Sequence, residues 1–522
     1  MANKTKFQAI KGTRDLLPPE TELWNRVEQT AREVFGTYGF GEIRPPIFEP
    51  TELFARAVGG ETDIVSKEMY SFLDNPELLE ILHAREVLKN LNPGTEPTAK
   101  GEFFELYASE FISKIENSLT SNKISLSTRA QSDFDIMKAR FQELINLPDV
   151  RDQRTNERRE SLTLEIIIRA DLGIFAEQIS LRPEATASVC RAYIEHNMQQ
   201  LPAPVKLYYT GPMFRRERPQ KGRYRQFYQI GAEVLGGTDA PGIDAEVIEM
   251  VMVFFARLEL PGVQLEINSI GCRECRPKYV ELLRAELQKV KDKLGADSQR
   301  RIETNPLRVL DSKLESEQAI IEKLPRIGEH LCEECAKHYA EVKRQLGMRG
   351  VAYRENWRLV RGLDYYMRTT FEITAKGLGS QNAVCGGGRY DGLMELLGGP
   401  PTKGIGFAIG EDRVILSLQE AGKGGTAQGR DVYIAWMGEK AQATAIGAAR
   451  KLREAGFRVE LPPVEQKFGK ALGQADKLGA KFALILGDDE VASGQWTLKT
   501  LADGKQEKIG AGELVEALKK RV

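Results

Sequence analysis

A ten-residue segment, Ala421–Arg430, constrains the architecture of this chain more than any other feature of its sequence. The segment reads AGKGGTAQGR, with four glycines and almost nothing apolar, which is typical of a linker. Beyond it, runs of strand composition alternate with amphipathic runs at helical spacing, which predicts a separate α/β domain over residues 431–522. Its predicted strands are Val432–Trp436, Phe457–Leu461, Phe482–Leu486 and Trp496–Leu501, and its predicted helices are Ala441–Ala455, Lys467–Leu478 and Gly512–Lys520.

The residues before the linker are too many for one hydrophobic core, so the chain of 522 residues must form several domains. Apolar residues make up 41% and charged residues 29%, as in ordinary folded proteins. The 74 basic and 75 acidic residues nearly cancel, so any binding to nucleic acid must depend on a local patch. The start of the chain lacks the apolar core of a secretory signal, and six cysteines are too few for a disulfide scaffold. We therefore expect a cytoplasmic protein.

Residues 74–171 are predicted to form a mainly helical insertion. Apolar spacing predicts helices over Leu78–Leu91, Phe103–Leu119 and Phe134–Ile145, with polar turns at Asn92–Lys100 and Leu119–Asp133. A charged run, Asp149–Glu160, follows them. The block has 13 basic and 18 acidic residues, which argues against a second nucleic-acid surface. Before the insertion, the spacing of apolar residues predicts a long helix over Glu20–Tyr38.

A cluster of arginines follows the predicted strand Val205–Thr210. Six basic residues and a single acid lie within Arg215–Arg225, between that strand and a second one at Phe227–Val234, which predicts a hairpin. Arg215, near the strand, would be held rigidly and suited to phosphate oxygens. Tyr224 and Phe227 could hold a base or an RNA backbone together with the loop arginines. A solvated basic hairpin is the alternative for such a cluster.

Three further motifs lie nearer the linker. In Leu359–Phe371, LVRGLDYYMRTTF, a charged Arg361 in a predicted strand needs an anionic partner, either a carboxylate such as Asp364 or a ligand phosphate. In Ala383–Gly392, AVCGGGRYDG, three consecutive glycines would allow the backbone to approach a ligand, although a tight turn would also explain them. Gly404–Arg413, GIGFAIGEDR, lacks the spacing of a dinucleotide fingerprint and instead predicts a strand that leads into a helix.

Two CxxC pairs lie in a mostly helical stretch, residues 266–350. Their spacing suits a structural zinc site made of four thiolates, but the sequence favours reduced, unpaired thiols over such a site. The nearby His330 and His338 are interpreted as lone surface residues. The four cysteines are Cys272, Cys275, Cys332 and Cys335.

In their order along the chain, these motifs resemble those of the class II aminoacyl-tRNA synthetases, and specifically the histidyl-tRNA synthetase family. Pro45–Phe72 resembles the first class motif, Tyr208–Gly236 the second and Gly404–Val414 the third. The stretches LVRGLDYY and AVCGGGRYDG are similar to the two signatures of the histidine enzymes. The resemblance extends from Lys11 to the C-terminus except for residues 74–171.

The resemblance implies an α/β fold: a class II antiparallel sheet flanked by helices, a helical insertion and a C-terminal α/β anticodon-binding domain. It divides the chain into three parts of a catalytic domain (1–73, 172–265 and 351–420), the insertion at 74–171, a helical subdomain at 266–350, the linker at 421–430 and the anticodon-binding domain at 431–522.

The resemblance also implies an activity. Family members join histidine to ATP as histidyl adenylate, with Mg²⁺ and release of pyrophosphate, and then transfer histidine to the 3′ end of their tRNA. Arg361, Arg215 and Arg413 would be catalytic, because positioned cations stabilise the charge that gathers on a reacting phosphate. ATP would contact Arg215, Glu217, Arg223, Phe227 and Arg413. Histidine would contact Glu184, Thr186, Gln229, Glu233, Tyr365 and Tyr366, which offer both donors and acceptors to an ammonium and an imidazole.

The implied partners are L-histidine, ATP, a histidine tRNA and a second copy of the chain, with no membrane. Arg218 and Gln220 of the hairpin loop would meet the tRNA acceptor end, and the first motif would form the homodimer interface. Ala185 departs from the family, which commonly has glycine there, and the insertion is a structural extension or a partner-binding module.

The rival functions are a catalytically inactive relative that binds a ligand or protein, and an RNA-binding protein without catalysis. An inactive relative would typically have lost arginines such as Arg215, Arg361 or Arg413. The interpretation as an RNA-binding protein leaves the histidine-pocket residues unexplained.

Overall fold

The computed structural model describes residues 7–60, 62–73, 97–120, 128–148, 152–169, 178–363, 365–379, 382–424 and 429–521. The chain forms two compact units. The first comprises Met1–Asp15 and Val27–Lys423, and the second comprises Leu16–Arg26 and Gly424–Val522. The boundary near Gly424 lies inside the segment with linker composition. Among the described helices, none combines the length and the apolar character that crossing a lipid bilayer requires.

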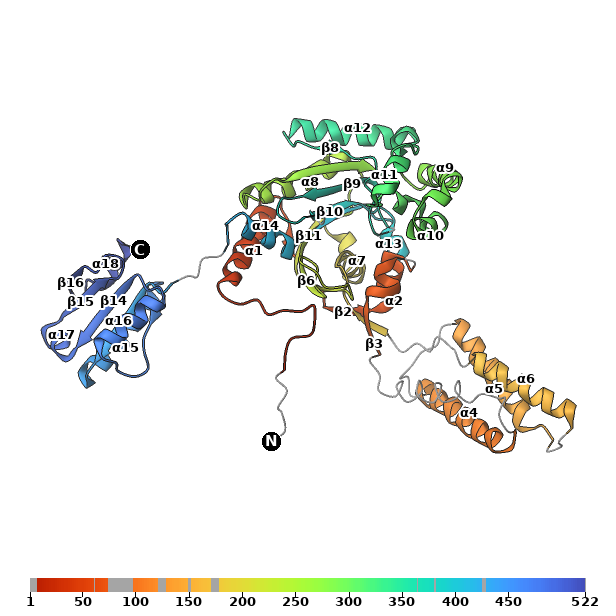
Figure 1. Cartoon of the computed structure of the whole chain (residues 1–522), viewed down its shortest axis with the longest axis horizontal. Coiled ribbons are helices and arrows are strands. Elements are labelled where there is room, and N and C mark those ends of the chain that lie inside the picture. The colour runs from red at the N-terminus through yellow and green to blue at the C-terminus, as the bar shows by residue number, and fades with distance from the viewer. Residues whose placement is uncertain are drawn as a thin grey trace. The chain divides into compact units, whose positions relative to one another are not determined.

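The first unit is built on an eight-stranded sheet whose spatial order is β1-β5-β6-β11-β10-β9-β7-β8 (Figure 1). Neighbouring strands pair antiparallel from β5 to β7, and only the short edge strands β1 and β8 pair in parallel. This sheet confirms the predicted fold class. The strands are β1 (Gly41–Glu42), β5 (Val205–Phe214), β6 (Gln226–Leu235), β7 (Gln264–Ser269), β8 (Arg354–Glu355), β9 (Met367–Thr374), β10 (Ala383–Arg389) and β11 (Gly404–Gly410).

Helices cover both faces of this sheet. On one face, the ring of Phe35 in α1 (Glu20–Thr37) lies 5.8 Å from those of Tyr208 in β5, Phe407 in β11 and Phe254 in α8 (Pro241–Arg257), measured between centroids. On the other face, α7 (Thr186–Glu195) buries Val189 and Tyr193 in a core shared with the sheet. Helix α14 (Glu411–Glu420) follows β11 directly, so the predicted strand-to-helix turn is confirmed. The remaining elements of this core are α2 (Thr51–Val58), the one-turn π-helix Ile64–Glu68, the 3₁₀ turn Met198–Gln200 and α13 (Leu393–Leu396).

The stretch between β7 and β8 is mostly helical, as predicted. It contains α9 (Cys275–Lys289), α10 (Ala296–Thr304), α11 (Glu315–Ile321) and α12 (Glu333–Met348), with 3₁₀ turns at Lys291–Lys293, Pro306–Val309 and Ile327–Glu329.

A separate three-stranded sheet has the order β2-β4-β3, formed by Phe48–Pro50, Gln178–Leu181 and Tyr70–Leu73. Strands β3 and β4 pair antiparallel, with Leu73 opposite Gln178. The segment between these two strands is therefore attached at one end of a single hairpin.

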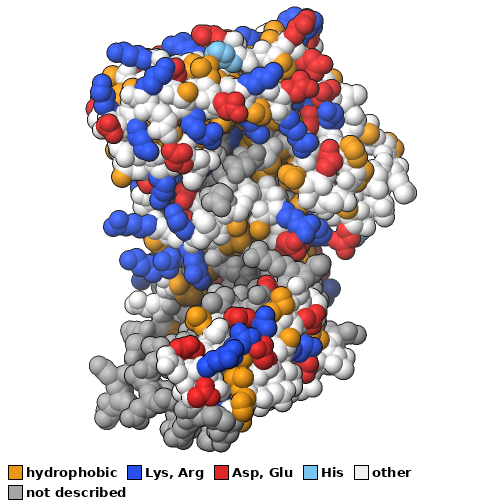
Figure 2. All heavy atoms as spheres, turned by 90° about the vertical axis from the view of Figure 1, so that its right-hand side faces the viewer, with side chains coloured by type: hydrophobic (Ala, Val, Ile, Leu, Met, Phe, Trp, Pro, Cys, Tyr) orange, Lys and Arg blue, Asp and Glu red, His pale blue; other side chains and the backbone are white. Residues whose placement is uncertain are grey.

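Three described helices lie between β3 and β4: α4 (Pro97–Thr120), α5 (Thr128–Ile145) and α6 (Gln153–Arg169). The first two confirm the helices predicted at Phe103–Leu119 and Phe134–Ile145, and the one predicted at Leu78–Leu91 lies outside the described residues. Helix α6 was missed, because its start coincides with the charged run Asp149–Glu160. Pairs between helices involve charges of this run: Arg158 donates to Glu143 at 2.9 Å, and Arg159 pairs with Glu105 at 3.5 Å. Acidic and basic side chains are also mixed on the molecular face in Figure 2.

The second unit contains a five-stranded sheet in the order β13-β12-β14-β15-β16. Its first three strands are parallel and its last two are antiparallel. The predicted strands and helices are confirmed, whereas β16 and α17 were not predicted. The elements are β12 (Val432–Met437), α15 (Glu439–Glu454), β13 (Val459–Glu460), α16 (Phe468–Lys477), β14 (Phe482–Gly487), α17 (Asp488–Ser493), β15 (Gln495–Thr500), β16 (Gln506–Gly510) and α18 (Leu514–Lys519).

Candidate active site

A cavity of about 280 Å³ opens over β6, β9, β10 and β11. Most of the residues predicted for the site lie in its wall, although they come from distant parts of the sequence. The predicted residues that line it are Glu184, Thr186, Arg215, Glu217, Arg223, Phe227, Gln229, Arg361, Tyr365, Tyr366 and Arg413. Glu233, Arg218 and Gln220 do not line it.

The arginine hairpin forms one end of the cavity. Strands β5 and β6 pair along their whole length, and Arg215 continues the ladder by donating its backbone N–H to Arg225 O at 2.9 Å. The Arg215 guanidinium donates to Pro183 O at 2.9 Å and lies over the ring of Phe227. Glu217 forms ion pairs with Arg215 at 3.8 Å and Arg223 at 3.1 Å. Arg215 is therefore a fixed cation in the wall, and the alternative of a solvated hairpin is wrong for it.

Arg413 joins the same end of the cavity from the first turn of α14. Its guanidinium donates to Ala383 O at 2.7 Å and Gly222 O at 3.3 Å, so it bridges β10 and the hairpin loop. Burial and then the nearby Arg223 guanidinium lower the pKa of Arg413, although an arginine stays charged at physiological pH. The hairpin and α14 thus concentrate positive charge where an anionic group can bind.

Arg361 also lines the cavity. It precedes β9 in a segment without regular structure, so the expectation that it lies in a strand is wrong. Its Nη1 donates to Glu372 Oε2 at 2.7 Å, and its guanidinium faces the ring of Tyr366. The predicted internal partner, Asp364, lies outside the described residues. Among the described residues, Arg361 Nε is buried without a hydrogen-bond partner, which leaves it able to donate to a ligand.

The glycine run of β10 makes room for neighbouring side chains. A Cβ at Gly386 would overlap the guanidinium of Arg361, and one at Gly387 would come within 2.5 Å of Phe371 and of Gly406 O. The three glycines lie inside strand β10, so the tight turn that was the alternative explanation for them is wrong. Gly386 lines the cavity, but what its missing side chain accommodates is an arginine of this chain.

The end of the cavity at the start of α7 is acidic and aromatic, and it lies next to Arg215, which donates to Pro183 O. Glu184 accepts the backbone N–H groups of Thr186 at 2.8 Å and Ala187 at 3.0 Å at the start of α7. Burial raises the pKa of Glu184, and these hydrogen bonds oppose that effect. Tyr365 and Tyr366 pack against each other with ring centroids 4.7 Å apart. This end offers carboxylate and hydroxyl groups within an aromatic wall.

Gln229 also lines the cavity. Within the described part of the chain, its Oε1 is buried and has no hydrogen-bond partner. A buried carbonyl without a partner is costly. Because this atom is buried, a ligand in the cavity reaches it only if the Gln229 side chain turns toward the ligand.

Glu233 lies behind the wall. Its carboxylate accepts hydrogen bonds from Thr186 Oγ1 at 2.7 Å and from the hydroxyl of Tyr390. Burial raises the pKa of Glu233 to about 8, although both hydrogen bonds act in the opposite direction. Glu233 therefore orients Thr186 and does not itself reach the cavity.

Two charged residues in the wall were missed by sequence reasoning. Glu372, the partner of Arg361, is the one acid in strand β9, and its place eleven residues after Arg361 was the available signal. Asp412 accepts Arg14 Nη2 at 3.0 Å and the backbone N–H of Tyr228 at 2.9 Å, which ties the start of the chain and β6 to α14. Its position next to Arg413 was the only sequence signal for it.

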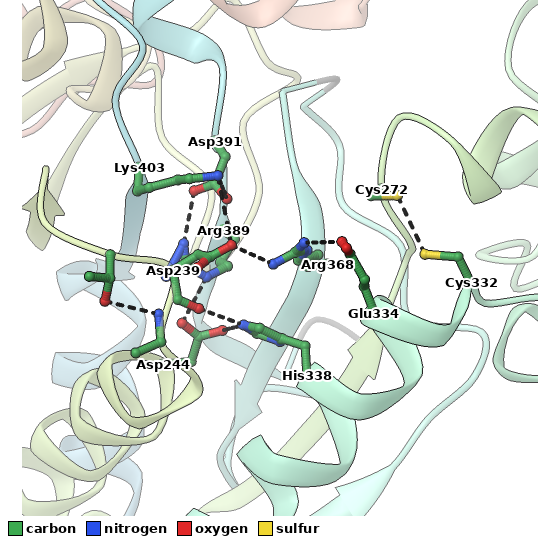
Figure 3. A network of polar contacts seen from close by, with 12 residues as sticks. Asp239, Asp244, Cys272, Cys332, Glu334, His338, Arg368, Arg389, Asp391 and Lys403 are labelled. Atoms are coloured by element: carbon green, nitrogen blue, oxygen red, sulfur yellow. Dashed lines mark hydrogen bonds and ion pairs between the residues drawn. The ribbon is translucent and has the colours of Figure 1, made fainter.

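The four cysteines of the CxxC pairs meet at one point outside this cavity. Their Sγ atoms all lie within 4.8 Å of one another. His330 is exposed as expected, but the expectation of a surface position for His338 is wrong, because it is 7% exposed and its Nε2 lies 3.0 Å from Asp239 O. Burial lowers the pKa of His338 to about 4. Figure 3 shows it in a polar network with Asp244, Arg389 and Arg368, next to the cysteines.

Comparisons with known proteins agree with this geometry. The family model described as histidyl-tRNA synthetase matches residues 144–414, and the model described as anticodon binding domain matches residues 431–521. The histidine–tRNA ligases of Koribacter versatilis and Solibacter usitatus are 45% and 44% identical, and the alignments cover 97% and 98% of this chain and 95% and 99% of theirs. The apo histidyl-tRNA synthetase of S. aureus is similar in structure, with a TM-score of 0.68 and 31% identity, over 98% of this chain and all of that one.

Proposed function

Because this chain belongs to the histidyl-tRNA synthetase family, we propose that it is a histidine–tRNA ligase that works through the cavity over β6, β9, β10 and β11. It joins L-histidine to ATP as histidyl adenylate, releases pyrophosphate, and then transfers histidine to the 3′ end of tRNA. One observation carries the residue assignment: a group of arginines that includes Arg361 and a group of acidic and aromatic side chains line a single cavity.

In the activation step, a carboxylate oxygen of histidine attacks the α-phosphorus of ATP, and the bond between the α-phosphorus and its bridging oxygen to the β-phosphate breaks. Negative charge gathers on the phosphoryl oxygens as this happens. Arg215 and Arg361 hold the α-phosphate and the carboxylate, and Arg223 and Arg413 hold the departing phosphates. The anchoring of Arg215 by Pro183 O and of Arg413 by Ala383 O supports these roles, because cations that are already positioned need not reorganise during the reaction.

Adenine binds beside Phe227, with Glu217 near its edge. Mg²⁺ fits the same end, because it is commonly held by one or two carboxylates together with substrate phosphates. Glu372, next to the arginines in the wall, is the carboxylate that would hold it. When bound, the ion neutralises charge on the phosphates.

Histidine binds at the acidic, aromatic end. Its ammonium and imidazole groups need several acceptors and donors, which Glu184, Thr186, Gln229, Tyr365 and Tyr366 supply. Their place in the wall of one cavity supports this assignment. A different amino acid would leave these buried polar groups unpaired, which is a strong basis for selection. Glu233 acts as a positioning residue through Thr186.

In the transfer step, a ribose hydroxyl at the tRNA 3′ end displaces AMP from the adenylate. We assign contact with the acceptor end to Arg218 and Gln220, which are exposed in the hairpin loop next to the cavity. The domain over residues 431–522 binds the anticodon region of the tRNA.

The working form is a homodimer whose interface includes Pro45–Phe72. Three large apolar side chains of this segment, Ile47, Phe48 and Phe72, are 44%, 53% and 48% exposed in the single chain. Apolar side chains gathered on a surface are typical of an interface. Light scattering of the purified protein measures the oligomeric state, and a monomer at micromolar concentration would contradict this assignment.

Exchange of labelled pyrophosphate into ATP tests the activation step directly. We expect exchange with histidine and Mg²⁺ and none with the other nineteen amino acids, followed by histidine transfer to tRNA when tRNA is added. Folded protein that gives no exchange with any amino acid would refute the proposal in favour of a ligand-binding relative without catalysis.

A further inference from the structure

We propose that Cys272, Cys275, Cys332 and Cys335 bind one structural zinc ion, and that this ion positions the loop that carries Tyr365 and Tyr366. Zinc binding is independent of the proposed function, whereas its effect on histidine binding rests on that function.

The positions of the sulfur atoms match a tetrahedral ion. A Zn–S distance of about 2.3 Å places the sulfurs of a tetrahedral site about 3.8 Å apart. The Sγ of Cys272 lies 3.7 Å from that of Cys275 and 3.8 Å from that of Cys332. These separations are far longer than the bond of a disulfide, which is about 2.0 Å.

Two turns from distant parts of the chain present the thiols. Cys272 and Cys275 lie between β7 and the start of α9, and Cys332 and Cys335 lie at the start of α12. Gly271 has φ +71°, and a Cβ there would approach Cys275 Sγ to 2.8 Å. The backbone N–H of Cys272 points to Cys275 Sγ at 3.2 Å, and that of Glu274 to Cys272 Sγ at 3.4 Å. Such hydrogen bonds stabilise thiolates and orient them toward a metal.

Two arginines lie next to the turns that carry the cysteines. Four thiolates around Zn²⁺ carry a net charge of minus two, which favours nearby cations. The guanidinium of Arg368 lies 3.7 Å from Glu334, inside the second turn, and pairs with Asp239 at 2.8 Å (Figure 3). Arg273, inside the first turn, points its guanidinium at Gly392 O at 3.5 Å.

The first turn is hydrogen-bonded to the start of β9, directly after Tyr365 and Tyr366. The backbone N–H of Arg368 donates to Gly271 O at 2.8 Å, and that of Ile270 donates to Arg368 O at 2.9 Å. Arg276, in the first turn of α9, donates from its guanidinium to the carbonyl of Tyr366. Arg368 is also held at φ +51°, in the left-handed region that residues other than glycine seldom adopt. A metal that fixes the turn therefore fixes the backbone on which the two tyrosines depend.

Zinc analysis of the full-length, untagged protein tests the first part. We expect about one zinc per chain, its loss in Cys332→Ser, and its retention in Cys190→Ser, which changes a cysteine of α7. If Cys332→Ser fails to fold, the zinc content of the unaltered protein and the ligand-field absorption of its Co²⁺ form still decide the question. Metal-free protein with four titratable thiols, or with a disulfide detected by mass spectrometry, would overturn the zinc site.

Histidine kinetics test the second part. Arg276→Ala removes the donor to Tyr366 O, and we expect the KM for histidine to rise about tenfold, as for loss of a charged hydrogen bond, while the KM for ATP stays within about twofold. Arg276→Lys should recover part of this loss. The matched control is Arg284→Ala, on the same helix, whose guanidinium donates to Ile302 O at 3.2 Å and should leave both constants unchanged. Equal rises in both KM values, or no change, would refute the positioning role even if zinc is present.

Discussion

The contact between Gly386 and Arg361 supports a prediction that can be worked through in numbers. A methyl group at residue 386 would overlap three atoms of the Arg361 guanidinium, namely Nη1, Nη2 and Cζ. Because the glycine is inside β10, its backbone cannot move away without disturbing pairing on both sides. In Gly386→Ala the arginine must therefore leave its place and lose its 2.7 Å bond to Glu372.

The size of the effect follows from the hydrogen bonds that are lost. A hydrogen bond to a charged group contributes about 1.5–3 kcal/mol, so losing the proposed contact with the reacting groups should lower kcat/KM in pyrophosphate exchange by about 10- to 150-fold. The fold should survive, since Arg361 is at a cavity wall. Gly347→Ala, on α12 with open space around the new methyl group, is the control and should keep wild-type exchange.

A double-mutant cycle tests whether the substitution acts through the arginine. If Gly386→Ala works only by displacing Arg361, the combination with Arg361→Ala should exchange no more slowly than Arg361→Ala alone. Fully additive losses would refute this reasoning, as would a folded Gly386→Ala protein with wild-type exchange.

Other perturbations should separate the activation step, the transfer step and the stability of the fold. Arg361→His should slow adenylate formation at least as much as Gly386→Ala does, without unfolding the protein, and an unchanged exchange rate would remove Arg361 from the catalytic role. Deleting residues 75–170 should spare pyrophosphate exchange, because the chain enters and leaves the block at one end of the β3–β4 hairpin; a folded deletion protein without exchange would contradict this. Burial raises the pKa of Glu233 to about 8, so the native state favours the protonated carboxyl and loses stability as pH rises from its unfolded value through about 8. Glu233→Gln should therefore gain thermal stability relative to wild type between pH 5 and pH 8.5, and a constant difference in melting temperature across this range would show that Glu233 does not titrate as described. Arg218→Ala and Gln220→Ala should slow aminoacylation of tRNA while leaving exchange unchanged, and slowed exchange would place them in the activation step instead.

Sequence patterns predicted the elements whose residues interact mainly with neighbours in the chain. The hairpin around Arg215 and the turn from β11 to α14 follow from local strand, turn and helix signals. Helix α6 was missed because its many charges resemble a loop until Arg140 and Glu165 are seen to pair across two helices. The periodicity of one segment carries no information about such partners.

The site could be predicted as a set of residue types but not as a set of contacts. Arg361 clearly required an anion, yet its partner is Glu372, eleven residues further on, because β9 folds back past the arginine. Glu233 has the chemistry of a substrate-binding residue. Its actual position behind Thr186 follows from the packing of β6 against α7, which the sequence of neither element shows. The meeting of the two CxxC pairs likewise depends on the folding of the helices between them.

The pairing of Leu73 with Gln178 has a consequence for how such a chain can change over time. Paired strands bring the two ends of the intervening segment to within about 5 Å, and each doubling of a loop's length costs only about 0.6 kcal/mol of closure entropy. The hairpin can therefore accept, lose or exchange a whole module without altering the register of the sheet that carries it. Inserted domains can therefore be gained or replaced here during evolution while the catalytic core retains its geometry. A protein engineer can likewise graft a reporter domain with adjacent termini at this position.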